Sequence, residues 1–317
     1  MAEKPTFKDI LDAAERISPY INRTPVLTCS SLDSMFGAKL YFKCENFQKA
    51  AAFKFRGACN AVFSLSDDLA KKGVATHSSG NHAAALALAA RLRGIDSFIV
   101  MPKTAPTIKK LAVEGYGGQI TYCEPTLKAR ETTLEKVINQ TNATVIHPYN
   151  DYRIIAGQGT AAMELLEDIH SLDVVMIPIG GGGLTSGTAL AIAGVSSKTR
   201  VIAAEPEGAD DAFRSLKEGK IMPSINPHTV ANGLLTSLGD LTFPIIRELV
   251  EQIVTVSDKA TIAGMRHVWE RMKIIIEPSA AVPVGALLEK KIDINGKRVG
   301  IILSGGNVDL ERLPWNL

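Results

Sequence analysis

Four consecutive glycines, Gly180 to Gly183, restrict the fold of this chain more than any other feature. They follow an apolar run predicted as a strand (174–179) and precede a segment predicted as a helix (185–193). Glycine lets a backbone approach a ligand closely, and the helix start adds N–H groups and a positive dipole end. A plain turn needs only one or two glycines, so the pattern favours a phosphate-binding strand–loop–helix unit.

The same strand–helix alternation continues along the whole chain. Predicted strands cover 39–43, 73–77, 97–101, 119–123, 143–146, 174–179, 200–204 and 299–304. Predicted helices include 7–17, 54–65, 81–92, 105–114, 126–140, 158–169, 185–193, 259–272 and 280–288. This alternation predicts an α/β fold with mostly parallel sheets flanked by helices. Because no linker divides the chain, we predict two interleaved lobes: a small domain of residues 73–150 and a large domain of 1–72 with 151–317.

Composition excludes several functional classes. The 317 residues suffice for two such lobes, and a net charge of +2 with mixed signs argues against nucleic acid or a membrane surface as partner. The four cysteines (Cys29, Cys44, Cys59 and Cys123) form no CxxC pair, so we expect free thiols in the cytoplasm. The charged, amphipathic N-terminus is unlike a signal peptide, and the glycine run interrupts the most apolar stretch.

Lys54 stands in the run Ala50-Ala51-Ala52-Phe53-Lys54-Phe55-Arg56. Apolar surroundings lower the pKa of a lysine amine, and the neutral amine forms Schiff bases with aldehydes such as pyridoxal phosphate. On this segment alone, a solvated lysine at a helix start is the better explanation. Other motifs are needed to assign Lys54 a chemical role.

Two polar loops follow predicted strands in the same way as the glycine run. Ser78-Ser79-Gly80-Asn81-His82 opens a helix whose N–H groups can bind a carboxylate, although Asn81 alone could be an ordinary N-cap. Ser304-Gly305-Gly306-Asn307 follows the last strand, where a glycine pair can also be a simple turn. Ligands bind at the carboxyl ends of parallel strands, so three such loops together predict one binding site.

The segment Glu205-Pro206-Glu207-Gly208-Ala209-Asp210-Asp211 carries four carboxylates in seven residues. Oxygen ligands of this kind suit magnesium or calcium, and a solvated acidic loop explains the cluster equally well. The six histidines are scattered, which argues against a zinc site.

Together these motifs resemble the fold-type II pyridoxal-phosphate enzymes, which share the fold of the tryptophan synthase β subunit, in the serine/threonine dehydratase branch. The matching segments are 53–58, 78–82, 180–183 and 304–307, in the order of the family. The stretches TPVLT (24–28), FKCENFQK (42–49), AGQGT (156–160) and LSGGNVDL (303–310) resemble those of eukaryotic-type serine racemases and hydroxyaspartate dehydratases more closely.

The resemblance implies a role for each motif in holding pyridoxal 5'-phosphate. Lys54 would form the Schiff base, with Phe53 beside the ring. The cofactor phosphate would lie on Gly180, Gly181, Gly182 and Gly183. Asn81 would bond the ring hydroxyl, and Ser304 would meet the pyridine nitrogen.

The resemblance also implies a substrate site and a metal site. The substrate carboxylate would bind the loop of Ser78, Ser79, Gly80, Asn81 and His82, and Arg130 could approach an acidic substrate side chain. Glu205, Asp211 and the carbonyl of Ala209 match a divalent-cation site for Mg²⁺ or Ca²⁺, with Mn²⁺ as an alternative. This match favours a metal over a solvated acidic loop.

A serine beside the pyridine nitrogen predicts the reaction type. Serine cannot hold a positive charge on that nitrogen, so the ring is a weaker electron sink than in transaminases. Elimination and racemisation are then favoured, with Lys54 and Ser79 as acid/base groups on opposite faces of Cα. We therefore expect a serine racemase that also dehydrates serine, threonine or related β-hydroxy amino acids. The resemblance also implies a homodimer.

Three alternatives stay open. One is a dedicated 3-hydroxyaspartate dehydratase that uses Arg130. Another is an NAD-dependent dehydrogenase that uses the glycine loop and Glu205, although Gly187 comes one residue late for GxGxxG. The third is a non-catalytic binding protein, against which Lys54 and Ser79 argue.

The lysine loop departs from the pattern of the family. Ala50-Ala51-Ala52 stands where relatives have glycine and hydroxyl residues. Ala51 in place of glycine should crowd the loop. The missing hydroxyl at Ala50 weakens the case for ATP as an effector near Ser30 and Lys49.

Overall fold

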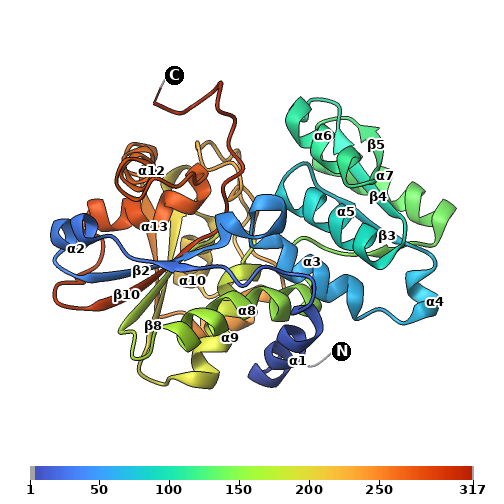
Figure 1. Ribbon diagram of the computed structural model, residues 1–317. Helices are drawn as coiled ribbons and strands as arrows, with labels where there is room; N and C mark the ends of the chain where they lie inside the picture. The colour runs from blue at the N-terminus through green and yellow to red at the C-terminus, as the bar shows by residue number, and fades with distance from the viewer. Residues whose placement is uncertain (1–3, 316–317) are drawn as a thin grey trace.

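The computed structural model describes residues 4–315 and forms two lobes, each built on its own sheet (Figure 1). In the large sheet the strands lie in the order β1 (Val26–Leu27), β2 (Lys39–Cys44), β10 (Arg298–Leu303), β7 (Val174–Pro178), β8 (Arg200–Pro206) and β9 (Gln252–Val256). In the small sheet they lie in the order β5 (Gln119–Cys123), β4 (Ser97–Pro102), β3 (Val74–His77) and β6 (Thr144–Val145). All neighbours are parallel except β1 and β2.

Helices fill the chain between these strands. The α-helices are α1 (Phe7–Ile17), α2 (Ser30–Phe36), α3 (Lys54–Phe63), α4 (Asp67–Ala70), α5 (Asn81–Arg93), α6 (Thr107–Gly115), α7 (Leu127–Thr141), α8 (Tyr152–Asp168), α9 (Gly183–Val195), α10 (Asp211–Glu218), α11 (Thr242–Leu249), α12 (Asp258–Met272) and α13 (Pro278–Leu288). Short 3-10 turns are η1 (Glu45–Phe47), η2 (Lys49–Ala51) and η3 (Glu207–Ala209).

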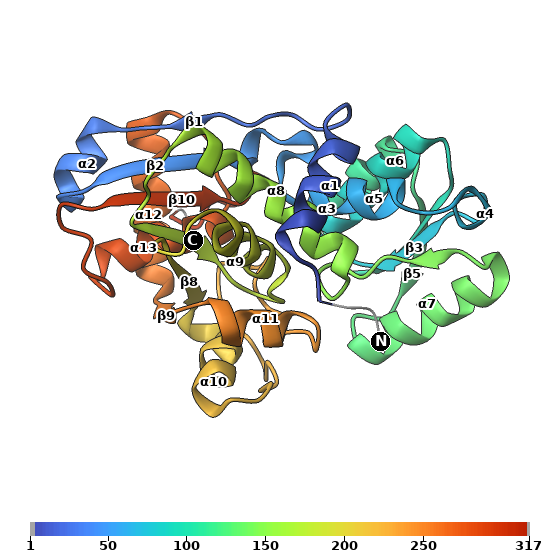
Figure 2. The ribbon, with the colours of Figure 1, turned by 90° about the horizontal axis from the view of Figure 1, so that it is seen from below.

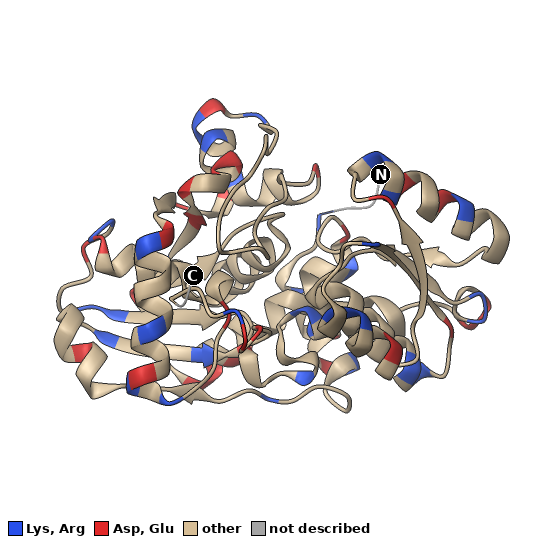
Figure 3. Cartoon of the chain, turned by 90° about the horizontal axis from the view of Figure 1, so that it is seen from above, with Lys and Arg blue, Asp and Glu red and all other residues tan. Residues whose placement is uncertain are grey.

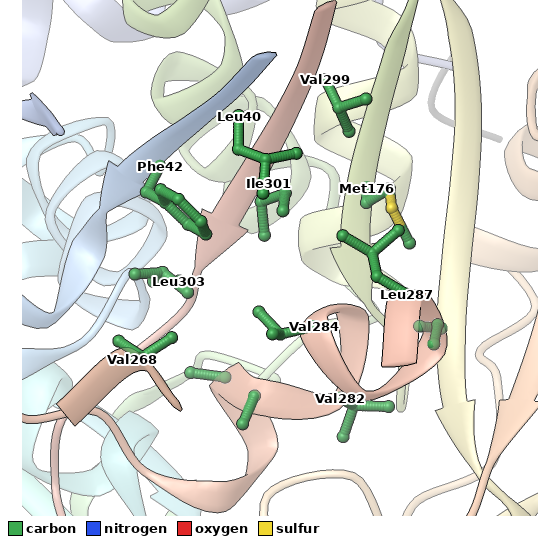
Figure 4. Packing of buried hydrophobic residues seen from close by; sticks show 14 of the residues in the cluster. Leu40, Phe42, Met176, Val268, Val282, Val284, Leu287, Val299, Ile301 and Leu303 are labelled. Carbon is green, nitrogen blue, oxygen red and sulfur yellow. The ribbon is translucent and has the colours of Figure 1, made fainter. Parts of the chain in front are cut away.

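The large sheet is buried on both faces, which explains its continuous apolar strands. On one face, Phe42, Ile301 and Met176 point toward α13, where Val284 and Leu287 pack against them (Figure 4). On the other face, residues of α8 and α9 pack against the alternate strand positions, and both helices lie in front of the sheet in Figure 2. The core therefore fixes the strand ends from which the polar loops emerge.

The small sheet is also covered on both faces. The helices α3 and α5 pack on one face together with Ile99 and Met101 of β4. On the other face, Leu134 and Val137 of α7 pack against Val100. Because α3 also packs on α8 of the large lobe, its first residue, Lys54, lies where the lobes meet.

The predicted fold class, two interleaved lobes with mostly parallel sheets flanked by helices, is confirmed. Residues 4–315 contain no helix long and apolar enough to cross a membrane. Acidic and basic residues are interspersed along both lobes in the view of Figure 3.

Several element boundaries were wrong, and close helix packing explains one of them. The helix α8 begins at Tyr152, six residues before the predicted start at 158. The prediction was late because Gly157 and Gly159 suggest a break in a helix. A Cβ on Gly157 would lie 2.7 Å from the Cα of Gly57, and a Cβ on Gly187 would lie 2.6 Å from the amide nitrogen of Gly159. These glycines let α8 approach α3 and α9.

Other elements carried too weak a signal for sequence reasoning. The strands β1 and β9 and the helices α2, α4, α10 and α11 were not predicted. Each has eight residues or fewer, so hydrophobic periodicity is hard to recognise. The helix α9 also begins earlier than expected, at Gly183 within the glycine run.

Candidate active site

Lys54 is the first residue of α3 and points toward the segment that follows β6. Its Nζ donates a hydrogen bond to the Pro148 carbonyl at 2.8 Å and lies 5.1 Å from the centre of the Phe53 ring. Burial of the amine lowers the pKa of Lys54 to about 8, although the negative charge of Glu277 acts in the opposite direction. A useful fraction of this amine is therefore neutral near physiological pH.

The glycine loop lies beside the segment that Lys54 contacts. Gly180 to Gly183 are all buried, and no acceptor for their N–H groups is found within residues 4–315. The helix α9 begins at Gly183, so its first turn adds further free donors. Buried amide groups without partners are costly, and an anion bound here would satisfy them. A phosphate group fits this site.

Only glycine is compatible with the closeness of Tyr149 to this loop. A Cβ on Gly181 would lie 2.4 Å from the Tyr149 ring, and Gly182 has a φ of +89°. Since Tyr149 follows Pro148, a single turn of chain contacts both Lys54 and the glycine loop.

Ser304 lies at the end of β10, next to the lysine loop. Its carbonyl accepts a hydrogen bond from the Phe53 amide at 3.0 Å, and Ala52 forms a β-bridge with Gly305. Ser304 is only 3% exposed, and no bond to its hydroxyl is found among the described residues. The hydroxyl is therefore available to a bound group.

Two alanines that precede Lys54 adopt a left-handed backbone. Ala50 has a φ of 56° and Ala51 a φ of 52°, which a side chain with a Cβ adopts only at a cost of about 1 kcal/mol or more per residue. The loop is held nonetheless, because the Ala51 carbonyl accepts from the Gly306 amide at 2.9 Å and the Ala50 carbonyl accepts from Asn307 Nδ2 at 2.8 Å.

Asn81 connects the small lobe to the large lobe through both atoms of its amide. Its Nδ2 donates to Glu277 Oε1 at 2.9 Å, and its Oδ1 accepts from Asn307 Nδ2 at 3.0 Å. Sequence reasoning missed Glu277, whose pKa burial raises to about 7. The available signal was a lone acid between three isoleucines and Pro278, at the start of α13.

The loop from Ser78 to Gly80 is half-buried, and the Ser79 hydroxyl has no hydrogen bond to any residue that the structure describes. His82 behaves differently. Its Nε2 lies 3.2 Å from the Ile146 carbonyl, which can only accept, so we assign the proton to Nε2 and leave the buried Nδ1 without a partner. Burial lowers the pKa of His82 to about 3, so it is neutral at physiological pH.

Arg130 lies on α7, which packs against β3, the strand that precedes the loop from Ser78 to Gly80. Its Nε is buried and has no partner in the described part of the chain. His77, which directly precedes the loop, has a lowered pKa because it is buried; the negative charge of Glu131 acts in the opposite direction, and the positive charge of Arg130 adds to the lowering. Arg130 is thus close enough to influence this loop electrostatically.

The acidic segment is folded around the start of α10. The Glu205 oxygens accept from the amides of Ala212 and Phe213, both at 2.8 Å, and burial raises the pKa of Glu205 to about 8. Both oxygens of Asp211 are buried and lack partners among the described residues, and burial raises the pKa of Asp211 to about 6. Ala209 is also buried.

The oxygen donors of this segment suit a hard cation. Residues 4–315 contain no group of three or more His, Cys, Asp or Glu side chains that could hold a metal ion. Two carboxylates and one carbonyl would therefore need water ligands to complete an oxygen shell. Each Glu205 oxygen accepts one amide of α10 and keeps a second lone pair, which a cation could take.

Comparisons of the sequence and of the structure with known proteins all find pyridoxal-phosphate enzymes or their relatives. A family model described as pyridoxal-phosphate dependent enzyme matches residues 17–305. The β-hydroxyaspartate dehydratase of Paracoccus denitrificans is 54% identical, over 98% of this chain and 99% of that protein. The serine racemase of Arabidopsis thaliana is 52% identical, over 97% and 94%. The crystal structure of Dictyostelium discoideum serine racemase aligns with a TM-score of 0.92 at 48% identity, over 96% of this chain and 99% of that one.

Proposed function

This chain belongs to the pyridoxal-phosphate dependent enzyme family, and from that premise we propose that it racemises serine and dehydrates serine, threonine and related β-hydroxy amino acids. One observation carries the proposal. The desolvated amine of Lys54 is bonded to Pro148, and the next residue, Tyr149, packs on the buried glycine loop. A nucleophilic amine and an anion cradle thus lie together at the junction of the lobes.

The residues present fit the cofactor. The free N–H groups of Gly180 to Gly183 would hold its phosphate, Lys54 would bind its aldehyde carbon, and Phe53 would lie beside its ring. The Ser304 hydroxyl would bond the ring nitrogen without stabilising a positive charge there, and Asn81 would bond the ring hydroxyl. When bound, the cofactor withdraws electrons from the Cα of the amino acid.

Proton transfer would be divided between two residues. Lys54 removes or returns the Cα proton on one face, and Ser79 does so on the other. For racemisation, one residue takes the proton and the other supplies one to the opposite face. For dehydration, the Cα–H bond and the Cβ–O bond break, the hydroxyl leaves with a proton as water, and hydrolysis of the product releases ammonia and a keto acid. His82 is neutral, so it brings no positive imidazolium charge to the site of proton transfer.

A dedicated 3-hydroxyaspartate dehydratase is the second candidate. The relative from Paracoccus denitrificans carries that activity in its name. Within this chain, the unpartnered Nε of Arg130 favours it, because a second substrate carboxylate would satisfy that group.

Further parts of the proposal concern assembly and ions. We propose that residues 73–150 act as the small domain, that Glu205, Ala209 and Asp211 bind Mg²⁺ or Ca²⁺, and that the enzyme is a homodimer. Ala50 lacks a hydroxyl, so ATP is the weakest of the proposed ligands. The four cysteines are free, which supports a reducing compartment such as the cytoplasm.

A direct assay separates the candidates. The purified enzyme is given L-serine, D-serine, L-threonine and 3-hydroxyaspartate in parallel, and both keto acid and the opposite enantiomer are followed. The racemase proposal predicts D-serine from L-serine together with pyruvate. Keto acid from 3-hydroxyaspartate alone would establish the dedicated dehydratase instead. A colourless protein that binds NAD would overturn both.

A further inference from the structure

The turn from Gly239 to Thr242 lies directly behind the glycine loop. Thr242 is fully buried at the first position of α11. Its Oγ1 accepts a hydrogen bond from the Gly239 amide at 2.9 Å and lies 2.9 Å from the Gly181 carbonyl and 3.2 Å from the Gly239 carbonyl. We assign the single hydroxyl proton to the nearer acceptor, the Gly181 carbonyl. One hydroxyl therefore joins the glycine loop to a turn about sixty residues further along the chain.

This hydrogen bond determines where a donor of the loop points. In a trans peptide the C=O and N–H groups point in opposite directions, and no cis peptide is found in residues 4–315. Because Thr242 holds the Gly181 carbonyl, the Gly182 N–H must point away from Thr242. The Gly182 carbonyl accepts from the Ser186 amide at 2.8 Å, which directs the Gly183 N–H in the same manner.

The loop is enclosed from two sides. A Cβ on Gly182 would lie 2.9 Å from Thr242 Cβ and 2.7 Å from Ile246 Cδ1, both in α11. A Cβ on Gly181 would meet the Tyr149 ring. The glycines thus fill the narrow space between α11 and Tyr149, so a shift of either neighbour would move the loop.

Asn150 connects these two neighbours. It follows Tyr149 in the chain, its Oδ1 accepts from the Leu241 amide at 2.9 Å, and its Nδ2 donates to Asp240 Oδ1 at 2.6 Å. A Cβ on Gly239 would lie 2.2 Å from Asn150 Oδ1, so the turn is pressed closely against this side chain. The amide of Asn150 therefore fixes the distance between Tyr149 and the start of α11.

We propose that Thr242 and Asn150 are positioning residues that hold the glycine loop in the conformation that binds phosphate before the cofactor arrives. The inference rests on the proposed function, which makes the anion a cofactor phosphate. Preorganised donors bind an anion without the cost of ordering the loop. The two side chains should therefore affect recognition of the phosphate group and not the reactivity of Lys54.

The test compares two ligands that differ only in the phosphate. The full-length protein is freed of cofactor and titrated with pyridoxal phosphate and, separately, with pyridoxal, and the absorbance of ligand bound to Lys54 is followed. In Thr242→Val, which keeps the shape and loses the hydrogen bond, affinity for pyridoxal phosphate should fall about tenfold while affinity for pyridoxal changes less than about twofold. Thr242→Ser should restore most of the difference.

Thr188→Val is the matched control, because Thr188 is also fully buried, lies on α9, and has a hydroxyl with no partner in the described structure. It should leave both affinities unchanged. If Thr242→Val fails to fold, Asn150→Ala tests the positioning role at a half-buried site. This variant should bind pyridoxal phosphate with about threefold lower affinity. Equal losses for both ligands, or no loss, would overturn the positioning role. A wild-type chain that binds neither ligand would instead refute the proposed function.

Discussion

Lys54 and Arg56 are two residues apart at the start of α3, and their surroundings differ sharply. Arg56 is fully buried, with Nε 2.7 Å from Glu45 Oε2 and Nη1 2.7 Å from Glu164 Oε1. Lys43, also fully buried, lies 2.6 Å from Glu164 Oε2. Lys54 has one neutral carbonyl as its partner. Both cations of α3 are thus removed from water, and only Arg56 forms ion pairs with carboxylates.

The difference separates a structural charge from a reactive one. Burial disfavours both charged forms, but the carboxylates around Arg56 more than compensate, so its pKa rises above the usual value. At Lys54 burial prevails and the pKa falls. Nearby, the Ser79 hydroxyl and the glycine-loop amides have no hydrogen-bond partner within the described residues. Groups left without partners mark where a ligand should bind.

The largest expected effect is on turnover. Lys54→Met removes the amine that we propose binds the cofactor and moves the Cα proton, so activity on serine should fall by about 10⁴-fold or more. The visible band of the purified protein should disappear as well. Retained turnover would contradict the reactive role of Lys54, which would then differ from Arg56 in its pKa alone.

Ser79→Ala tests whether the unpartnered hydroxyl of Ser79 is also reactive. Racemisation should fall by about 10²- to 10⁴-fold, since no group would then serve the second face of Cα. Elimination from L-serine should be partly kept because Lys54 still serves its own face. Chiral analysis of residual serine beside a pyruvate assay measures both, and an equal loss of the two activities would refute the two-base scheme.

Arg56→Met tests the structural member of the pair. Removing this guanidinium leaves Glu45 and Glu164 buried with only Lys43 nearby, so the cofactor-free protein should lose about 3–5 kcal/mol of unfolding free energy. Lys54→Met is the matched control and should cost little or be stabilising, because no carboxylate pair loses its partner. Denaturant unfolding of both variants gives the comparison, and similar losses would contradict it.

The local pattern was enough to place Lys54, the glycine loop and Ser304, because each follows or begins an element that the sequence predicts. It did not reveal Glu277 or Thr242. Asn81 and Glu277 are 196 residues apart, and Gly181 and Thr242 are 61 apart, so only the folded chain brings them together. The ion cluster of Arg56 was missed for the same reason, since Glu164 lies 108 residues away.

Asp211 extends the comparison to a carboxylate without partners. If it binds a cation, Mg²⁺ or Ca²⁺ at about 100 times its Kd should stabilise the protein by about 2.7 kcal/mol, and a chelator should reverse this. Asp211→Asn should abolish the effect. Asp210→Asn is the control, because Asp210 is paired with Arg214 at 2.8 Å and need not bind a cation. Equal stabilisation of the Asp211→Asn variant would exclude this site.

The smallest expected effect is the pH dependence of cofactor uptake by Lys54. Only the neutral amine reacts with the aldehyde, and the pKa of Lys54 is lowered from 10.5 to about 8. Uptake should therefore accelerate as pH rises through about 8, with roughly a tenth of the amine neutral at pH 7. The charge of Glu277 raises the pKa of Lys54, so Glu277→Gln should move the midpoint to lower pH. Stopped-flow absorbance of cofactor-free protein measures both midpoints. A wild-type midpoint near 10.5 would mean that Lys54 is as well compensated as Arg56, and the distinction between the two cations would fail.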